Sequence, residues 1–196
     1  MNESLHSSKE QLRQHLRKEA AHHDDYERIA QSKALCEQVK THPLWKSSHS
    51  LLFFWPLIGE PDLRPLCHEA IESGKVVAFP KYLADSSCYG AFPVTNLQAD
   101  LGPGQFGIPE PNLCSPERRL IGLDLIFVPG IGFSFDGARL GRGKGYYDRL
   151  LAEVSGTKCG VAFEWQITSE VPTDADDIRL DCVVTPSQWR AITLQH

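Results

Sequence analysis

Residues 125–154 read LIFVPGIGFSFDGARLGRGKGYYDRLLAEV and place a strand, a loop and a helix in that order. The first four residues, Leu125 to Val128, form a continuous apolar run of the kind found in buried strands. A loop rich in glycine and cations follows, and an apolar helical pattern runs from about Gly145 to Val154. A buried strand that leads through a loop into a helix is typical of an α/β sheet. The stretch therefore predicts that fold class.

The same alternation continues on both sides of this stretch. Helices are predicted at about Ser7–Ala21, Asp25–Thr41 and Asp62–Ser73, and strands at Leu51–Trp55, Val76–Phe79, Cys88–Val94, Cys159–Phe163, Cys182–Thr185 and Trp189–Leu194. Residues 95–116, rich in Pro and Gly, are expected to form a long ordered loop. Apolar strands separated by helices indicate parallel pairs that are covered on both faces. We therefore expect residues 1–196 to form a single domain, an open, mixed and mostly parallel sheet with helices on both faces.

Composition and charge exclude several classes of protein. The formal net charge of −5 argues against non-specific binding of nucleic acid. The longest apolar run, Leu51 to Trp55, is too short to span a membrane. The first residues lack the apolar segment of a signal peptide, and the six cysteines include no CxxC motif. We therefore expect a cytoplasmic protein with reduced cysteines, most of them packed in the core.

Three of the predicted strands run into segments that carry polar chemistry. The first leads to Glu60, the second to Lys81 and Tyr82, and the strand that ends at Val128 leads to the glycine-rich loop. Ligands of open α/β sheets bind beyond the carboxyl ends of the strands. Each segment taken alone is better explained as an ordinary turn. The three together predict one site that combines a carboxylate, a Lys–Tyr pair and an anion-binding loop.

Residues Arg139–Gly145 (RLGRGKG), which we call the glycine loop, have glycines at alternate positions and three cations. Glycine lets backbone N–H groups approach a phosphate closely, and the helix that follows adds its positive end. The loop fits neither standard nucleotide motif, because Lys144 is followed by glycine and Tyr146 stands at the third glycine position of a dinucleotide fingerprint. The alternative is a flexible, solvated basic loop. Against it, Tyr146 and Tyr147 provide an apolar anchor.

Two aspartates and one helical face are weaker candidates. Mg²⁺ bound to phosphates needs one or two carboxylates, and Asp148 and Asp181 are available. From spacing alone, each is better explained as an ordinary helix-end or strand-edge acid. Lys9, Arg13 and Arg17 recur every fourth residue and form a cationic stripe on the first helix. Such a stripe is more often a solvated face than the mark of a bound anion.

Residues 128–148, VPGIGFSFDGARLGRGKGYYD, resemble the signature of the 5-formyltetrahydrofolate cyclo-ligases, or 5,10-methenyltetrahydrofolate synthetases. Further matches follow in family order along nearly the whole chain: Lys9-x-x-Leu12-Arg13, Glu60, Phe79–Tyr82 (FPKY), Gly107–Pro111 (GIPEP) and Asp181. The resemblance implies a fold similar to that of ribose-5-phosphate isomerases and CoA transferases. It also implies an ATP- and Mg²⁺-dependent ligase that converts 5-formyltetrahydrofolate to 5,10-methenyltetrahydrofolate, with release of ADP and phosphate.

The resemblance implies a role for each candidate residue. Arg142 and Lys144 would act in catalysis, and Asp148 and Asp181 would hold Mg²⁺. The folate pocket would include Trp55, Glu60, Tyr82 and Tyr146. Nucleotide-binding residues would be Lys9, Arg13, Arg139, Leu140, Gly141, Arg142, Gly143, Lys144, Gly145, Tyr146 and Tyr147. Phe106 is expected to be a core residue and is left out of the site.

The implied chemistry agrees with these residue types. A formamide oxygen is a poor leaving group, and phosphorylation converts it into a good one, after which N10 can close the ring. Phosphoryl transfer needs charge neutralisation and alignment, which Arg142, Lys144 and Mg²⁺ would supply. The expected partners are small molecules, with no nucleic acid or membrane, and the expected form is a monomer.

Two other classes of function are kept as alternatives. A sugar-phosphate isomerase or CoA transferase on the related fold would need neither ATP nor folate. A nucleotide- or RNA-binding module is supported only by the cationic stripe of the first helix, and the net charge of −5 counts against it.

Overall fold

β6 (Gly122–Val128) and β1 (Ser50–Leu52) lie in the middle of a seven-stranded sheet with the order β11-β10-β9-β6-β1-β2-β3. The structure, a computed structural model, describes residues 3–192. β6 pairs in parallel with β1 and β9, β1 with β2, and β9 with β10, whereas the outer strands β3 and β11 are antiparallel to their neighbours. The expected open, mixed and mostly parallel sheet is thus confirmed. The remaining strands of the sheet are β2 (Val76–Leu83), β3 (Cys88–Pro93), β9 (Ser155–Val161), β10 (Cys182–Val184) and β11 (Trp189–Ala191).

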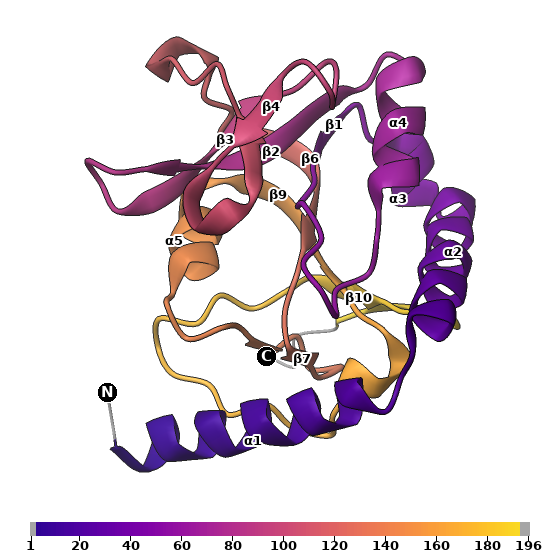
Figure 1. Cartoon of the computed structure of the whole chain (residues 1–196), viewed down its shortest axis with the longest axis vertical. Helices are drawn as coiled ribbons and strands as arrows, with labels where there is room; N and C mark the ends of the chain where they lie inside the picture. Colours follow the sequence, from indigo (N-terminus) through magenta and orange to yellow (C-terminus); the bar gives the residue numbers. More distant parts are fainter. Residues whose placement is uncertain (1–2, 193–196) are drawn as a thin grey trace.

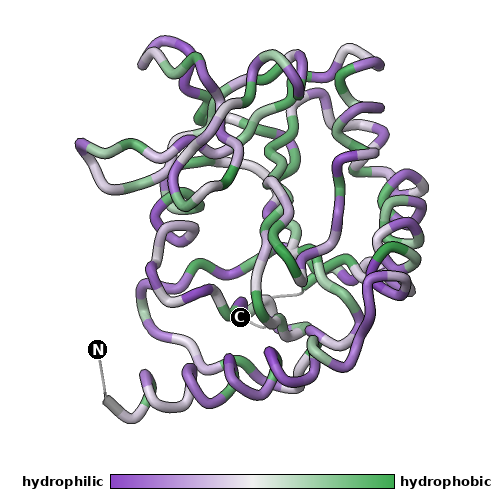
Figure 2. The backbone as a smooth tube through the Cα atoms, viewed as in Figure 1, coloured by the Kyte–Doolittle hydropathy of each residue, from purple (hydrophilic) through white to green (hydrophobic). Residues whose placement is uncertain are grey.

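Helices cover both faces of this sheet (Figure 1). Successive residues of a strand point to opposite faces. Leu51 and Phe127 therefore pack against one layer of helices, while Leu52 and Ile126 pack against the other. Figure 2 shows hydrophobic residues concentrated along the central strands. The first layer consists of α2 (Asp25–Thr41), α3 (Pro43–Ser47) and α4 (Arg64–Glu72), and the second contains α5 (Tyr146–Glu153).

α1 (Glu3–Ala21) lies away from the sheet, along the lower edge of the view in Figure 1, and is largely hydrophilic (Figure 2). Its Leu16 packs in a small apolar cluster with Ala138, Leu140 and Val171. Two of these residues belong to the segment after β6, in which β7 (Gly132–Phe133) and β8 (Arg139–Leu140) form a short antiparallel pair. This packing places α1 beside the glycine loop.

Some element boundaries differ from those expected. α1 begins at Glu3, so Ser7 lies inside the helix and is not its N-cap. β1 ends at Leu52, because the chain leaves the sheet after the Phe53 N–H has bonded the Ala78 carbonyl. α4 begins at Arg64, whose N–H donates to the Asp62 carboxylate at 2.9 Å. Asp62 thus precedes the helix instead of starting it.

Residues 95–116 are more structured than a loop. β4 (Leu101–Pro103) and β5 (Pro109–Pro111) pair antiparallel around the 3₁₀ turn η1 (Gln105–Gly107), and η2 (Pro116–Arg118) follows. α3 was not expected, since Pro43 was interpreted only as the end of α2. Proline also suits the first turn of a helix, where its missing N–H would have no partner.

Several expectations are confirmed. α2 has the expected boundaries, and α5 is capped by Gly145 and Val154, the residues at which its pattern was expected to begin and end. β11 forms at Trp189–Ala191, and Leu194 lies outside the described residues. The cysteines expected in the core, Cys36, Cys67, Cys159 and Cys182, are buried free thiols. Within residues 3–192, no helix is both long and apolar enough to cross a membrane.

Candidate active site

The carboxyl ends of β1 and β6 are joined by an ion pair. The Arg142 guanidinium, in the glycine loop, donates to the Glu60 carboxylate at 2.9 Å. The Glu60 side chain is only 7% exposed, and its second oxygen accepts from the Leu57 N–H at 3.0 Å, whereas Arg142 is about half exposed. A buried carboxylate and a half-exposed cation therefore meet at the rim where the sequence predicted a site.

The glycine loop has the backbone of an anion-binding turn. Gly143 and Gly145 have φ angles of +94° and +64°, which residues with side chains rarely adopt. Alternation of such residues with ordinary ones turns successive N–H groups toward one concave side. α5 begins directly afterwards at Tyr146, so the positive end of its dipole adds to the same side. The loop is anchored, because Leu140 is buried and Tyr146 packs against the core.

The three cations of the loop have different environments. Arg139 is buried and donates to the Asp148 carboxylate at 2.7 Å, with its side chain 4% exposed. Its Nε atom is a buried donor without a partner among the described residues. Lys144 is exposed, and within residues 3–192 its ammonium forms no ion pair. Arg139 therefore supports the loop from the protein interior, whereas Lys144 and Arg142 are exposed to solvent.

Two residues of the cationic stripe on α1 are buried, which contradicts the solvated face that we considered the better interpretation. Arg13 is 6% exposed, and its Nε donates to the Gly141 carbonyl of the glycine loop at 2.9 Å. Lys9 is 8% exposed and pairs with Asp174 and Asp177. Only the third residue, Arg17, is exposed as expected of a solvated face. The reason is that Arg13 faces the glycine loop and Lys9 faces the segment 174–177, which sequence spacing alone does not reveal.

An aromatic cluster lies at the end of β2. The rings of Tyr82 and Tyr146 meet edge to face, with their centroids 5.6 Å apart. Phe106 adds a third ring, 6.4 Å from Tyr82 and 5.8 Å from Tyr146. Phe106 is 62% exposed, so the expectation that it is a core residue is wrong. Three rings with one side open to solvent provide a surface on which a flat ligand can stack.

The buried carboxylate of Glu110 explains why Phe106 lies there. It accepts from the N–H groups of Tyr82 at 3.3 Å and Gln105 at 3.2 Å, and it lies 3.6 Å from the Lys81 ammonium. These bonds tie η1 to the end of β2. At Gly104 a Cβ atom would come within 2.3 Å of the Glu110 side chain, so only glycine fits. The glycines on either side of the Gln105–Phe106 pair were the signal in the sequence for a tight, functional turn.

Trp55 and Tyr147 lie beside the rim, and the ring of each is stacked with an arginine of the protein itself. The guanidinium of Arg64 is stacked over the Trp55 ring at 5.3 Å, and this ring packs against the core. Tyr147 packs against both core layers with Arg139 over its ring at 5.8 Å. Burial raises the pKa of the Tyr147 hydroxyl well above its usual value, and the charge of Glu60 adds to this effect. Tyr147 is therefore a neutral, structural ring near physiological pH.

The two candidate metal ligands have different surroundings. Asp148 lies in the first turn of α5, beside the glycine loop, and one of its oxygens is bound to Arg139. Asp181 is exposed, and its carboxylate accepts from the Lys158 N–H at 2.7 Å where β9 and β10 run together. In the part of the chain that is described, no hydrogen bond or ion pair joins Asp181 to Asp148 or to the glycine loop. Nor do residues 3–192 contain a cluster of three or more potential metal ligands.

Comparison with known proteins gives the family. A family model described as the 5-formyltetrahydrofolate cyclo-ligase family matches residues 5–186. The chain belongs to this family. It is therefore an enzyme of the ligase class, and the resemblance of the glycine loop to the cyclo-ligase signature is confirmed.

Relatives of the enzyme match over most of their length. A 5-formyltetrahydrofolate cyclo-ligase of Mus musculus is 31% identical over 192 residues, which cover 92% of this chain and 95% of the relative. That of Escherichia coli K12 is 32% identical over 155 residues, 77% of this chain and 85% of the relative. The NMR structure of a 5,10-methenyltetrahydrofolate synthetase from Aquifex aeolicus has a TM-score of 0.83 at 36% identity and covers 96% of both chains. The cyclo-ligase fold thus extends over nearly the whole chain.

Proposed function

We propose that this cyclo-ligase converts 5-formyltetrahydrofolate to 5,10-methenyltetrahydrofolate at the expense of ATP, with release of ADP and phosphate. The observation that carries the proposal is the ion pair between Glu60 and Arg142, which brings a carboxylate beyond β1 against the cation of an anion-binding loop. A pterin held by Glu60 and a phosphate held by the glycine loop would be neighbours. Such proximity is what direct phosphoryl transfer between two substrates requires.

The nucleotide would bind along the glycine loop. Its residues from Arg139 to Gly145 offer backbone N–H groups, and Tyr146 and Tyr147 continue them into the first turn of α5. Lys144 is free to reach the terminal phosphate. The Arg13 guanidinium already donates to the Gly141 carbonyl. Lys9 lies one helical turn away from Arg13 on α1, along the same edge of the loop.

The folate would occupy the aromatic cluster. Its flat pterin ring is suited to stacking on Tyr82 and Tyr146, and Phe106 would cover it from the open side. Glu60 is fixed and buried, so its carboxylate is positioned to accept hydrogen bonds from the pterin N–H groups. Trp55 would form the outer wall. The proposal adds Phe106 to the residues expected from the sequence.

Mg²⁺ would be held chiefly through nucleotide phosphates, and Asp148 fits the role of a single protein ligand. Its carboxylate lies in the first turn of α5 next to the glycine loop and is 20% exposed. Mg²⁺ retains several waters and commonly takes one or two carboxylates together with phosphates. When bound there, the ion would neutralise charge on the phosphates during transfer. Asp181 stays the second ligand predicted from the sequence.

The residues suggest the following course of reaction. The formyl oxygen attacks the γ-phosphorus, and the bond from this phosphorus to the β,γ-bridging oxygen breaks to release ADP. N10 then attacks the formyl carbon, the bond from that carbon to the phosphorylated oxygen breaks, and N10 loses its proton to solvent. Lys144 and Arg142 stabilise the charge that spreads over the transferring phosphoryl group. The aromatic cluster excludes water that would otherwise consume the reactive phosphate ester.

A direct assay tests the proposal. The pure enzyme with ATP, Mg²⁺ and 5-formyltetrahydrofolate is expected to form methenyltetrahydrofolate, followed by its near-ultraviolet absorbance, with one ADP for each product. Omission of ATP is expected to abolish the absorbance change. Absence of product across a range of Mg²⁺ concentrations, or product without ADP, would contradict the proposal.

Phe106→Ala is expected to raise the KM for 5-formyltetrahydrofolate about tenfold, since the loss of one stacking ring removes about 1.4 kcal/mol of binding free energy. The KM for ATP is expected to stay the same, because Phe106 lies on the folate side of the rim. Steady-state kinetics in each substrate measures both constants. Phe106→Tyr, which keeps the ring, serves as the matched control. An unchanged KM for folate in Phe106→Ala would remove this residue from the pocket.

A further inference from the structure

The segment 174–177, between η3 (Glu164–Gln166) and β10, contacts the first half of α1 through a partly buried ion-pair cluster. The Lys9 ammonium lies 2.9 Å from the Asp174 carboxylate and 2.5 Å from that of Asp177. The same Asp177 oxygen accepts from the Asp174 N–H at 2.8 Å, which fixes the two carboxylates relative to each other. Lys9 is 8% exposed, so its ammonium is largely withdrawn from bulk water, and two of its three donors are bonded to these carboxylates.

We infer that Asp174 and Asp177 are positioning residues for the nucleotide: they hold Lys9 and thereby fix α1 against the glycine loop. The inference rests on the proposed binding of ATP at that loop. Neither aspartate belongs to the residues expected to bind ATP, folate or Mg²⁺. We call Lys9, Asp174 and Asp177 the α1 latch.

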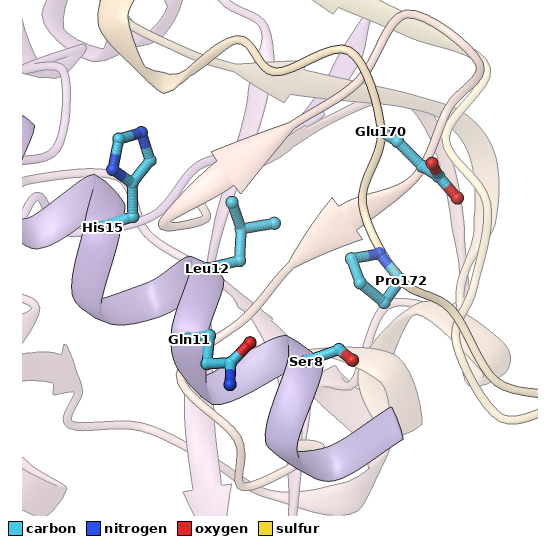
Figure 3. A pocket seen from close by; sticks show the side chains of 6 residues that line it. All are labelled: Ser8, Gln11, Leu12, His15, Glu170 and Pro172. Carbon is cyan, nitrogen blue, oxygen red and sulfur yellow. The ribbon is translucent and has the colours of Figure 1, made fainter. Parts of the chain in front are cut away.

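The packing of α1 shows why a polar latch is needed. The apolar attachment of the helix is the small cluster around Leu16, against which Leu12 also packs. Nearer to its start, the surface between α1 and the segment that precedes the latch is hollowed into an open groove of about 410 Å³ (Figure 3). The groove is lined by Ser8, Gln11, Leu12, His15, Glu170 and Pro172. Leu12 is only partly buried there, so the ion pairs of Lys9 add to the attachment of this part of the helix.

The latch is connected to the glycine loop through Arg13. One helical turn separates Lys9 from Arg13, so a rigid α1 transmits the position of one residue to the other. Arg13 donates to the Gly141 carbonyl at 2.9 Å, and its guanidinium lies 3.4 Å from the place where a Cβ atom of Gly143 would be. A shift of α1 would therefore move a cation that supports the loop backbone at two of its glycines.

The charges of the α1 latch favour its ion pairs near neutral pH. Burial alone would lower the pKa of Lys9, but its bonds to Asp177 and Asp174 raise it overall. The hydrogen bond from Lys9 lowers the pKa of Asp174. Lys9 and Asp174 are therefore both charged at physiological pH, which favours the ion pair between them.

The test measures both substrates on the full-length enzyme. In Asp174→Asn/Asp177→Asn, we expect the Kd for adenylyl imidodiphosphate with Mg²⁺, measured by calorimetry, to rise about tenfold. The KM for ATP is expected to rise by a similar factor, whereas the Kd and KM for 5-formyltetrahydrofolate stay within about twofold of the wild type. A general loss of structure would affect both substrates, so this difference identifies a positioning role.

Two further variants control the result. Asp176→Asn changes an exposed carboxylate in the same turn, beside the residues that pair with Lys9, and is expected to bind both ligands like the wild type. Asp177→Glu keeps the charge and is expected to retain most of the affinity for the analogue. If the double variant does not fold, Asp174→Asn alone carries the same comparison, with an expected rise of about threefold in the analogue Kd.

The outcomes separate this inference from the proposed function. Wild-type affinity for the analogue in Asp174→Asn/Asp177→Asn, or tighter binding, would overturn the latch while leaving ATP binding in place. An equal loss of affinity for both ligands would also overturn it. A wild-type enzyme that fails to bind the analogue at all would refute the proposed function, and the latch with it.

Discussion

Lys144→Ala and Arg142→Ala are each expected to lower kcat/KM for ATP by about 10³-fold while leaving the fold intact. Both side chains are exposed cations at the glycine loop, and the Lys144 ammonium has no ion-pair partner within the described part of the chain. Loss of Lys144 therefore costs little stability, whereas loss of Arg142 also leaves the Glu60 carboxylate unpaired; both changes delete charge that the transferring phosphoryl group requires. Steady-state kinetics and thermal melting on the same samples measure the two effects.

The two variants are expected to differ in their effect on folate. Arg142→Ala leaves Glu60 without its cation, so the affinity for 5-formyltetrahydrofolate is expected to change, whereas Lys144→Ala leaves this carboxylate paired. Lys46→Ala, which removes an exposed cation from α3 on the opposite face of the sheet, is the matched control and is expected to behave like the wild type. Normal turnover in both loop variants would show that the glycine loop does not hold the reacting phosphate.

Asp148→Ala is expected to reduce both activity and stability. Its carboxylate is the partner of the Arg139 guanidinium, whose side chain is only 4% exposed. Removal of one member of a buried ion pair leaves an unpaired buried charge and costs about 3 kcal/mol of the free energy of unfolding. Turnover is expected to fall with it, since the same residue is the proposed protein ligand of Mg²⁺. Denaturant unfolding and kinetics at several Mg²⁺ concentrations measure the two losses.

A double-mutant comparison separates the two effects of Asp148. Asp148→Ala combined with Arg139→Met removes both charges, so stability is expected to recover while activity stays low. Asp85→Asn, an exposed acid at the tip of the β2–β3 hairpin, is expected to change neither quantity. A fully stable Asp148→Ala protein would contradict the buried pair, and unchanged dependence on Mg²⁺ would contradict the proposed metal ligand.

The sheet and the site rim were predictable because their signals are local. The apolar run Leu125–Val128 is long enough to identify a buried strand, and the glycines of the following loop identify the turn. The rule that ligands bind beyond the carboxyl ends of strands then placed Glu60 and Arg142 at the same rim. Their ion pair, at 2.9 Å, agrees with that expectation.

The errors concern contacts between segments distant in sequence. Phe106 was taken for a core residue because it stands just before the rigid segment Ile108–Pro111, but the bonds of Glu110 to Tyr82 and Gln105 hold it at the open rim. Lys9 was assigned to a solvated stripe because its partners, Asp174 and Asp177, follow 165 and 168 residues later. The spacing of residues within α1 carries no information about partners so distant in the sequence. A pattern within one element indicates which face is special, but not what that face contacts.

The central claim is that the phosphoryl group of ATP passes directly to the formyl oxygen of the folate. The most direct measurement uses 5-formyltetrahydrofolate with ¹⁸O in the formyl group and follows the label by mass spectrometry of the released phosphate. We predict one ¹⁸O atom in each phosphate molecule formed, because the bond between carbon and the phosphorylated oxygen breaks in the ring closure. Recovery of the label in water, with unlabelled phosphate, would contradict the account.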